Sequence, residues 1–138
     1  EGYQSPPIIS LEAYTYYQKG AYLRLQNDQI RFFIGTETDE VQWLDGTIDR
    51  ANAWYHVVGT FDGTEASLWI NGVHQGAASV IGDIVYSSSD RDMRIGSWDL
   101  EWTSNDAFFD GAIDEVRVYD RAISEQEILY LYNECLHK

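Results

Sequence analysis

Two β-hairpin signals lie in one short stretch, residues 54–78, and they constrain the fold of this chain more than any other feature of its sequence. Asn71-Gly72 tolerates positive φ at both central positions of a type I′ turn, whose twist matches that of the strands it joins. Asp62-Gly63 predicts a second turn of the same kind. The runs around these turns are short and rich in β-branched and aromatic residues, at 55–61, 66–70 and 73–78. We therefore expect a three-stranded antiparallel meander.

The rest of the chain repeats this pattern of short strands separated by turn residues. Ala21, Leu23 and Leu25 alternate with larger or polar residues, which is typical of a half-buried strand. Asn27-Asp28 predicts a tight turn, and Asp45-Gly46 predicts the end of a strand. Strands are expected at 8–14, 21–26, 29–35, 41–44, 83–87, 92–97 and 108–119, with a polar loop over 99–107. The predicted class is all-β, an antiparallel β-sandwich in one domain spanning residues 1–138.

One short helix is predicted at the C-terminal end of the chain. Ser124 and Glu127 have the spacing of a capping box, in which each side chain bonds the backbone amide of the other residue. Apolar residues follow at i, i+3, i+4 and i+7, namely Ile128, Leu131, Tyr132 and Cys135. This spacing predicts a stripe that packs on the sheets. We expect Cys135, the only cysteine, to be packed on that stripe and not reactive.

Composition restricts the partners that the protein can have. The formal net charge is −14, from 23 acidic and 9 basic residues, and it would repel phosphate backbones and anionic lipids. We therefore expect no nucleic acid partner. No apolar run approaches the length of a transmembrane helix, which predicts no membrane insertion. No basic-then-apolar leader precedes Ser5, so we expect no signal peptide in the sequence as it stands.

Several short motifs follow one another in the order of a known family. They are Trp54-Tyr55-His56-Val57, Thr60-Phe61-Asp62-Gly63, Leu68-Trp69-Ile70-Asn71-Gly72, Arg94-Ile95-Gly96, and the segments 109–119 and 123–128. In these residues the chain resembles the laminin-G-like, concanavalin-A-like jelly rolls of lectin and glucanase type, from about Ile8 onward. The resemblance implies a jelly-roll sandwich with an extracellular or cell-surface location.

The chain looks short at its N-terminus relative to that family. Its members usually begin with two further strands, the first with a phenylalanine-aspartate-glycine turn, and neither precedes Pro6. Without these strands a sheet would show unpaired edges, which natural proteins cover, blunt or pair with another chain. We therefore hypothesise a homo-oligomer formed through an exposed sheet edge.

Asp114 is the most informative acidic residue. In a strand over 108–119 it would share a face with Val116 and Val118, and a carboxylate facing a core needs a partner. The resemblance implies calcium near this strand, with Asp110 as a second ligand. The alternatives are a hydrogen bond to loop backbone, which we favour because calcium needs 6–8 oxygens, or a β-bulge that turns Asp114 outward.

No catalytic motif is apparent in the sequence. His56 shares the parity of Trp54 and Val58, so we expect a satisfied core histidine, and the tryptophans of 54–78 are expected in the core as well. The retaining glycosidases of this fold need two carboxylates about 5–5.5 Å apart. Asp114 and Glu115 are adjacent and would point to opposite faces. We therefore predict that the protein is not an enzyme.

Aromatic residues at strand ends and in loops are the remaining candidates for ligand contact. Sugars stack their C–H faces on flat rings while nearby polar groups bind the hydroxyls. The predicted binding residues are Trp102, Trp98, Trp43, Asp99, Asn105 and Tyr86, with Trp102 the leading one because its neighbours are polar. The alternative is that Trp43 and Trp98 cover the sheet face as core. Tyr14, Tyr16 and Tyr17 form a second aromatic cluster, which fits a packed edge or a protein interface.

The sequence thus favours a non-catalytic, lectin-like module that binds a glycan or a protein surface through rim loops around 99–107. The alternative is a structural or adhesion domain that acts through self-association or protein contact. A glycoside-active enzyme is the weakest of the three hypotheses.

Overall fold

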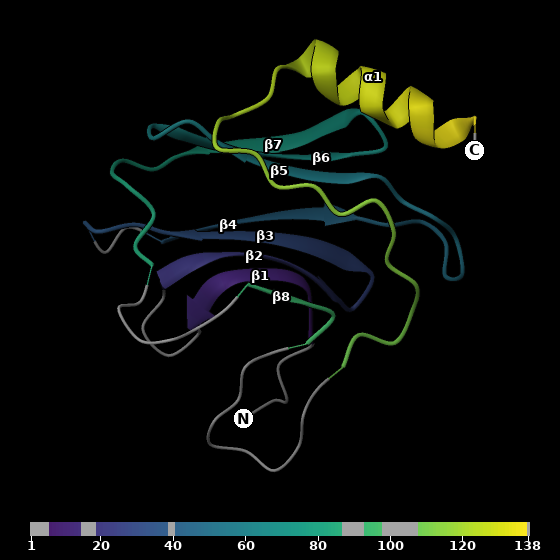
Figure 1. The fold of residues 1–138 in the computed structure, drawn as a ribbon, viewed down its shortest axis with the longest axis horizontal. Helices are drawn as coiled ribbons and strands as arrows, with labels where there is room; N and C mark the ends of the chain where they lie inside the picture. The colour runs from purple at the N-terminus through teal and green to yellow at the C-terminus, as the bar shows by residue number, and fades with distance from the viewer. Residues whose placement is uncertain (1–5, 15–18, 39–40, 87–92, 98–107, 138) are drawn as a thin grey trace.

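A computed structural model describes residues 6–14, 19–38, 41–86, 93–97 and 108–137. Within these residues, two antiparallel sheets face each other and a helix lies on the outer side of one of them (Figure 1). The larger sheet has the order β4-β3-β2-β1-β8, with β1 at Pro7–Tyr14, β2 at Lys19–Gln26, β3 at Gln29–Gly35, β4 at Val41–Thr47 and β8 at Arg94–Ile95. The smaller sheet has the order β5-β6-β7, with β5 at Val57–Phe61, β6 at Glu65–Ile70 and β7 at Val73–Ser79. The helix, α1, spans Glu125–Leu136.

The core lies between the inner faces of the two sheets. Alternate residues of β3 and β6 supply most of it, and these are buried, at 6% exposed or less: Ile30, Phe32, Ile34, Ala66, Leu68 and Ile70. The alternation read from 21–26 and 29–35 is confirmed, because Ala21 belongs to the same cluster and Leu23 and Leu25 pack against it. The predicted all-β sandwich with one C-terminal helix is therefore confirmed.

Two hairpins close through left-handed two-residue turns. Asn27 and Asp28 have φ of 50° and 60°, and Asn71 and Gly72 have φ of 51° and 74°. Both are the positive-φ pairs that a type I′ turn requires. The turn at Asp62-Gly63 is different, since only Gly63 has positive φ. There Asp62 Oδ1 accepts hydrogen bonds from the backbone amides of Thr64 and Glu65, each at 2.8 Å, so the side chain and not a second left-handed residue builds the turn.

Some predicted strand boundaries are wrong. β4 continues through Asp45-Gly46 to Thr47, because both residues pair with β3. The strand predicted at 83–87 is reduced, in its described part, to one bridge between Ile84 and Thr36, and that at 92–97 to the short β8 with a bridge at Ser97.

The strand predicted at 108–119 is also wrong. Apart from a bridge at Phe108, the segment is irregular and runs past β5 to α1 (Figure 1). Glu115 has φ of 52°, which interrupts an extended backbone, and its amide donates to Asp114 Oδ1 at 2.8 Å. Val116 and Val118 are 40% and 53% exposed, so Asp114 does not sit on a core-facing strand.

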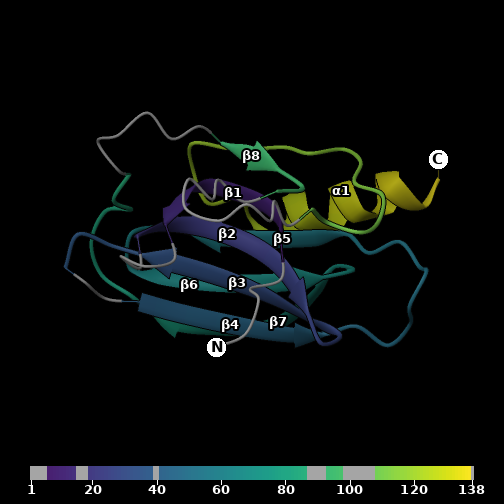
Figure 2. The same cartoon turned by 90° about the horizontal axis from the view of Figure 1, so that it is seen from below.

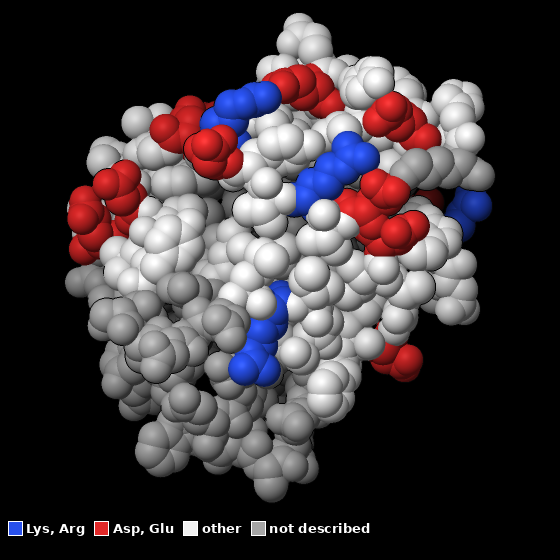
Figure 3. Space-filling model, in the orientation of Figure 1, with Lys and Arg blue, Asp and Glu red and all other residues white. Residues whose placement is uncertain are grey.

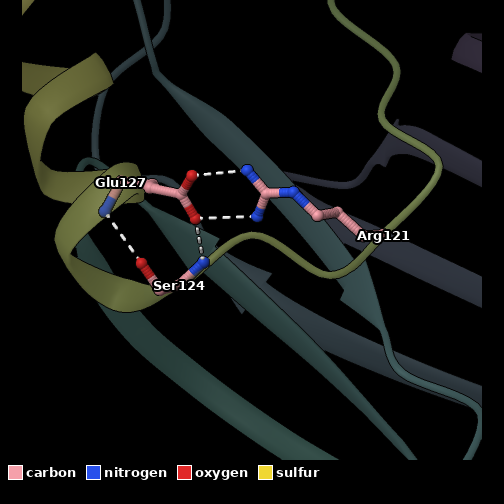
Figure 4. Close-up of polar contacts among 3 residues, drawn as sticks. All are labelled: Arg121, Ser124 and Glu127. Carbon is pink, nitrogen blue, oxygen red and sulfur yellow. Dashed lines mark hydrogen bonds and ion pairs between the residues drawn. The ribbon is translucent and has the colours of Figure 1, made fainter.

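The capping box at the start of α1 is confirmed and extended by an ion pair (Figure 4). The amide of Glu127 donates to Ser124 Oγ at 3.3 Å, and the amide of Ser124 donates to Glu127 Oε2 at 2.7 Å. Arg121 binds both carboxylate oxygens of Glu127, at 2.6 and 2.9 Å. On α1 Ile128 is buried, but Cys135 is exposed, so the prediction of a packed cysteine is wrong. In the described part of the chain, no helix is long and apolar enough to cross a bilayer.

Gly59 should tolerate no side chain. A Cβ at this position of β5 would lie 2.6 Å from two carbons of the Phe32 ring, which is itself buried. We expect Gly59→Ala to lower the free energy of unfolding by about 1–3 kcal/mol in urea denaturation, as overpacked cores do. Gly76→Ala is the matched control, because a Cβ there meets no atom within 4 Å, and it should change stability by less than about 0.5 kcal/mol. Equal effects of the two variants would contradict this packing.

Glu127 should make stability depend on acid pH. Its hydrogen bond with Arg121 and, as the second largest cause, its hydrogen bond with the Ser124 backbone lower its pKa from 4.5 to about 2. A depressed carboxyl pKa adds stability above pH 4.5, and this contribution is lost as pH falls from 4.5 to about 2. We expect the stability difference between wild type and Glu127→Gln, measured by urea unfolding, to shrink over that interval. Glu125→Gln removes another acid of the same helical turn and is the control; a pH-independent difference for Glu127→Gln would refute the expectation.

Candidate functional site

The outer face of the larger sheet, which Figure 2 views directly, carries side chains in two rows that cross the strands. Register places Ser10 opposite Tyr22, Tyr22 opposite Phe33, and Phe33 opposite Trp43. Register also places Arg24 opposite Arg31, and Arg31 opposite Asp45. All these residues alternate with core residues and therefore face away from the smaller sheet.

Three of these side chains, Tyr22, Phe33 and Trp43, form what we call the outer aromatic row. The Tyr22 and Phe33 rings stack with centroids 4.6 Å apart, and Phe33 and Trp43 follow at 6.4 Å in a tilted arrangement. Tyr22 and Phe33 are only 5% and 2% exposed, although they lie on the outer face, and burial raises the pKa of the Tyr22 hydroxyl. Trp43 is 52% exposed. It is the open end of the row.

An ion pair fixes the surroundings of Trp43. Arg31 Nε and Nη2 donate to the two oxygens of Asp45 at 2.7 and 2.8 Å, and the Arg31 guanidinium lies 5.3 Å from the centre of the Trp43 ring. The hydrogen bond from Arg31 lowers the pKa of the Asp45 carboxyl. A bidentate pair of this kind holds both side chains in one plane. Trp43 is thus flanked by an oriented carboxylate and guanidinium.

Arg24 adds a second cation to the same face. It is 7% exposed, lies directly opposite Arg31, and its guanidinium is 5.4 Å from the centre of the Tyr22 ring. Burial lowers its pKa. Like charges placed opposite each other in a sheet are unfavourable, and here Asp45 and the Tyr22 ring offset the repulsion.

The structure describes only part of the predicted ligand site. Trp43 is brought to the outer face, and the alternative that it belongs to the core is wrong. Tyr86 is 53% exposed and follows Val85, whose amide donates to the Gly35 carbonyl at 3.4 Å, so it lies by the end of β3. Trp98, Asp99, Trp102 and Asn105 lie outside the described residues, as do Tyr16 and Tyr17.

The predicted calcium ligands are both exposed. Asp110 and Asp114 lie on the irregular segment before α1, and Asp114 accepts the amide of Glu115. The local hydrogen bond that we favoured for Asp114 is therefore present, though on an exposed segment. In the described part of the chain, no three His, Cys, Asp or Glu residues come together as a metal site. The calcium role of these two residues stays a prediction.

His56 and Trp54 differ from their expected core positions. His56 is half-buried against Tyr132 of α1, with ring centroids 6.0 Å apart, and burial followed by the charge of Arg117 lowers its pKa. Among the residues that the structure describes, its buried Nδ1 has no hydrogen-bond partner, so a fully satisfied histidine is not seen there. Trp54 is 68% exposed on the loop between β4 and β5. Sequence reasoning missed it because its parity with His56 and Val58 applies only to a continuing strand, and β5 begins at Val57.

The fold is a β-sandwich of two antiparallel sheets with one C-terminal helix. A family model described as the concanavalin A-like lectin/glucanases superfamily matches residues 3–129. The chain therefore belongs to that superfamily, and the predicted resemblance is confirmed.

Two solved structures are similar to the chain. One is an S-layer domain-containing protein (residues 221–444) from Clostridium thermocellum, at 25% identity and a TM-score of 0.51, with 91% of this chain and 62% of that chain covered. The other is the binding domain of Paraclostridial Mosquitocidal Protein 1, at 14% identity and a TM-score of 0.65, with 94% of this chain and 31% of that chain covered. The chain thus spans less than two thirds of either structure. Among curated proteins, none matches the chain.

Asp45 should stabilise the outer face at neutral pH and not in strong acid. Because Arg31 lowers the Asp45 pKa below 3.8, its contribution is present above pH 3.8 and is lost as pH falls through the lowered value. We expect Asp45→Asn to reduce the free energy of unfolding at pH 7 by about 1 kcal/mol, and the deficit to vanish in acid. Urea denaturation between pH 7 and 2 measures it. Asp83→Asn, another exposed carboxylate, is the control, and a deficit that persisted at pH 2 would contradict the ion-pair origin.

Proposed function

We propose that this protein is a non-catalytic carbohydrate-binding module that holds a sugar ring against Trp43. The observation that carries the proposal is the half-exposed Trp43 ring, fixed between the Arg31–Asp45 pair and the buried part of the outer aromatic row. Membership in a superfamily of lectins and glucanases supports it. So does the likeness in fold to the binding domain of the mosquitocidal protein.

Binding would combine stacking with hydrogen bonding. The C–H face of a pyranose covers the free face of Trp43, while Asp45 accepts bonds from hydroxyl groups and Arg31 donates to hydroxyl oxygens. Because the sheet holds these groups before the ligand arrives, little conformational entropy is lost on binding. Tyr86, Trp98, Asp99, Trp102 and Asn105 remain part of the proposal as further contacts, and Asp110 and Asp114 as ligands of an optional calcium ion.

A hydrolytic role is less well supported than binding. A general acid at the glycosidic oxygen needs a raised pKa, so that it holds a proton at neutral pH. Asp45, two residues from Trp43 on the same strand, has a lowered pKa and is bonded through both oxygens to Arg31. This carboxylate suits a hydrogen-bond acceptor and not an acid catalyst.

A second candidate function is adhesion through contact between copies. β4 is an edge strand of the described larger sheet, and all seven of its residues pair with β3 in regular register, with only Asp45 charged. β7, the edge on the same side of the sandwich (Figure 2), is interrupted by a bulge at Gln75. A regular edge invites pairing and a bulge discourages it. For either function we propose an extracellular or cell-surface location and treat residues 1–138 as one module.

Trp43→Ala should abolish most glycan affinity. We expect a glycan array, with and without calcium, to identify a ligand, and titration calorimetry to show roughly tenfold or greater loss for the variant, as for other aromatic anchors. Tyr130→Ala removes another exposed aromatic, on α1, and should bind as wild type does. If the array shows no glycan binding and light scattering shows a stable dimer, the adhesion function is favoured. Release of reducing ends from β-glucans would revive the enzyme hypothesis.

A further inference from the structure

The loop between β4 and β5, residues 48–56, carries Trp54, whose 68% exposure is the highest among the described large apolar side chains. Figure 1 shows this loop extending beyond the ends of both sheets, at the right of the molecule. An exposed tryptophan leaves a large apolar ring in water, which is unfavourable unless something covers it.

Hydrogen bonds hold the backbone on both sides of Trp54, at the Arg50 amide before it and at the His56 amide after it. The next residue, Tyr55, packs its ring against the core, and its hydroxyl donates to Asp49 Oδ1 at 2.6 Å and accepts from the amide of Arg50 at 2.9 Å. Further along, the amide of His56 donates to Asn71 Oδ1 at 2.8 Å. Trp54 therefore stands on an anchored loop and not on a freely moving one.

Two charged residues lie on the same loop as Trp54. Asp49 and Arg50 have side chains 78% and 79% exposed, with Arg50 Nε 3.9 Å from Asp49 Oδ2. The hydrogen bond from Tyr55 lowers the Asp49 pKa, which keeps the carboxylate ionised and able to accept bonds. The loop thus carries an exposed aromatic ring, an acceptor and a donor, the same kinds of group as Trp43, Asp45 and Arg31 on the outer face.

We propose that Trp54, with Asp49 and Arg50, forms a second sugar-binding site, so that the module grips a neutral polysaccharide at two points. The inference rests on the proposed carbohydrate-binding function and extends it to a second site and a ligand class. We infer a neutral ligand because the whole chain carries a net charge of −14. Acidic side chains are also spread over the upper half of the face in Figure 3. A polyanion would be repelled.

The two sites lie along one stretch of chain. Trp43 sits within β4, and the loop begins one residue after β4 ends at Thr47. The four strand residues from Trp43 to Thr47 span about 13 Å. Once a long polymer is bound at one ring, its binding at the other ring is intramolecular. The overall affinity then exceeds that of either site alone. A single sugar unit cannot gain in this way.

The test follows the indole N–H signals of Trp43 and Trp54 by NMR. Soluble oligosaccharides of a β-glucan, a xylan, a mannan and a galactan are added to wild type, Trp43→Ala, Trp54→Ala and Trp54→Phe. We expect one of these neutral sugars to shift the Trp54 signal even in Trp43→Ala. In affinity electrophoresis with the matching polysaccharide, Trp54→Ala should lose about tenfold or more in affinity, and Trp54→Phe should recover part of it.

The outcomes separate this inference from the proposed function. If sugars shift the Trp43 signal, leave Trp54 unmoved, and Trp54→Ala binds the polymer as wild type does, the second site is refuted while the first stands. If neither signal moves with any sugar, both proposals fail. Tighter binding of polygalacturonate than of neutral polymers at low salt would overturn the ligand class.

Tyr55→Phe provides a matched control for loop order. It removes the hydroxyl that bonds Asp49 and the Arg50 amide but keeps the core ring and Trp54. We expect weaker polysaccharide binding with an unchanged Trp43 response, because a loosened loop must be ordered on binding. A Tyr55→Phe variant that binds as tightly as wild type would overturn the role given to the anchored loop.

Discussion

The register of the β2–β3 hairpin is the constraint on which the rest of this structure depends. The left-handed pair Asn27–Asp28 is the whole connection between the two strands. Gln26 therefore pairs with Gln29, and this pair sets the register of all the others. Because side chains alternate between faces, a slip of one residue would exchange the faces of one strand. It would bring Phe33 into the core and Phe32 out of it. The core and the outer face are thus set by the same turn.

That register also determines what the outer face can do. It puts Tyr22, Phe33 and Trp43 into one row and Arg31 beside Asp45 in the next. The inner members of the row are buried, so the outer face is itself packed and not merely solvated. Trp43 is held by this packing from one side and by the ion pair from another. A side chain restrained in this way can offer its free face to a ligand at little entropic cost.

Local signals in the sequence predicted those elements whose structure is decided locally. The asparagine turns at 27–28 and 71–72 and the capping box at Ser124 depend on a few neighbouring residues, and all three form as expected. The strand at 108–119 was predicted from alternation, but alternation gives no strand unless a partner edge accepts it, and Glu115 turns the backbone away. Asp45-Gly46 looks like a turn, yet pairing with Arg31 and Ile30 keeps it in β4. Tertiary context decided these cases.

The candidate site was predictable only in part, and the reason is the position of β4. Trp43 was identified from its place near a strand end, and Asp45 lies two residues further along the same strand. Arg31, however, meets Trp43 only through the register of β3 with β4. Tyr22 and Phe33 lie in central strands, each paired with a strand on both sides, and are buried. Trp43 has a strand neighbour on one side only, since β4 pairs with β3 alone in the described sheet. Trp43 is therefore exposed because β4 is an edge strand. The same strand leads directly into the loop that carries the exposed Trp54.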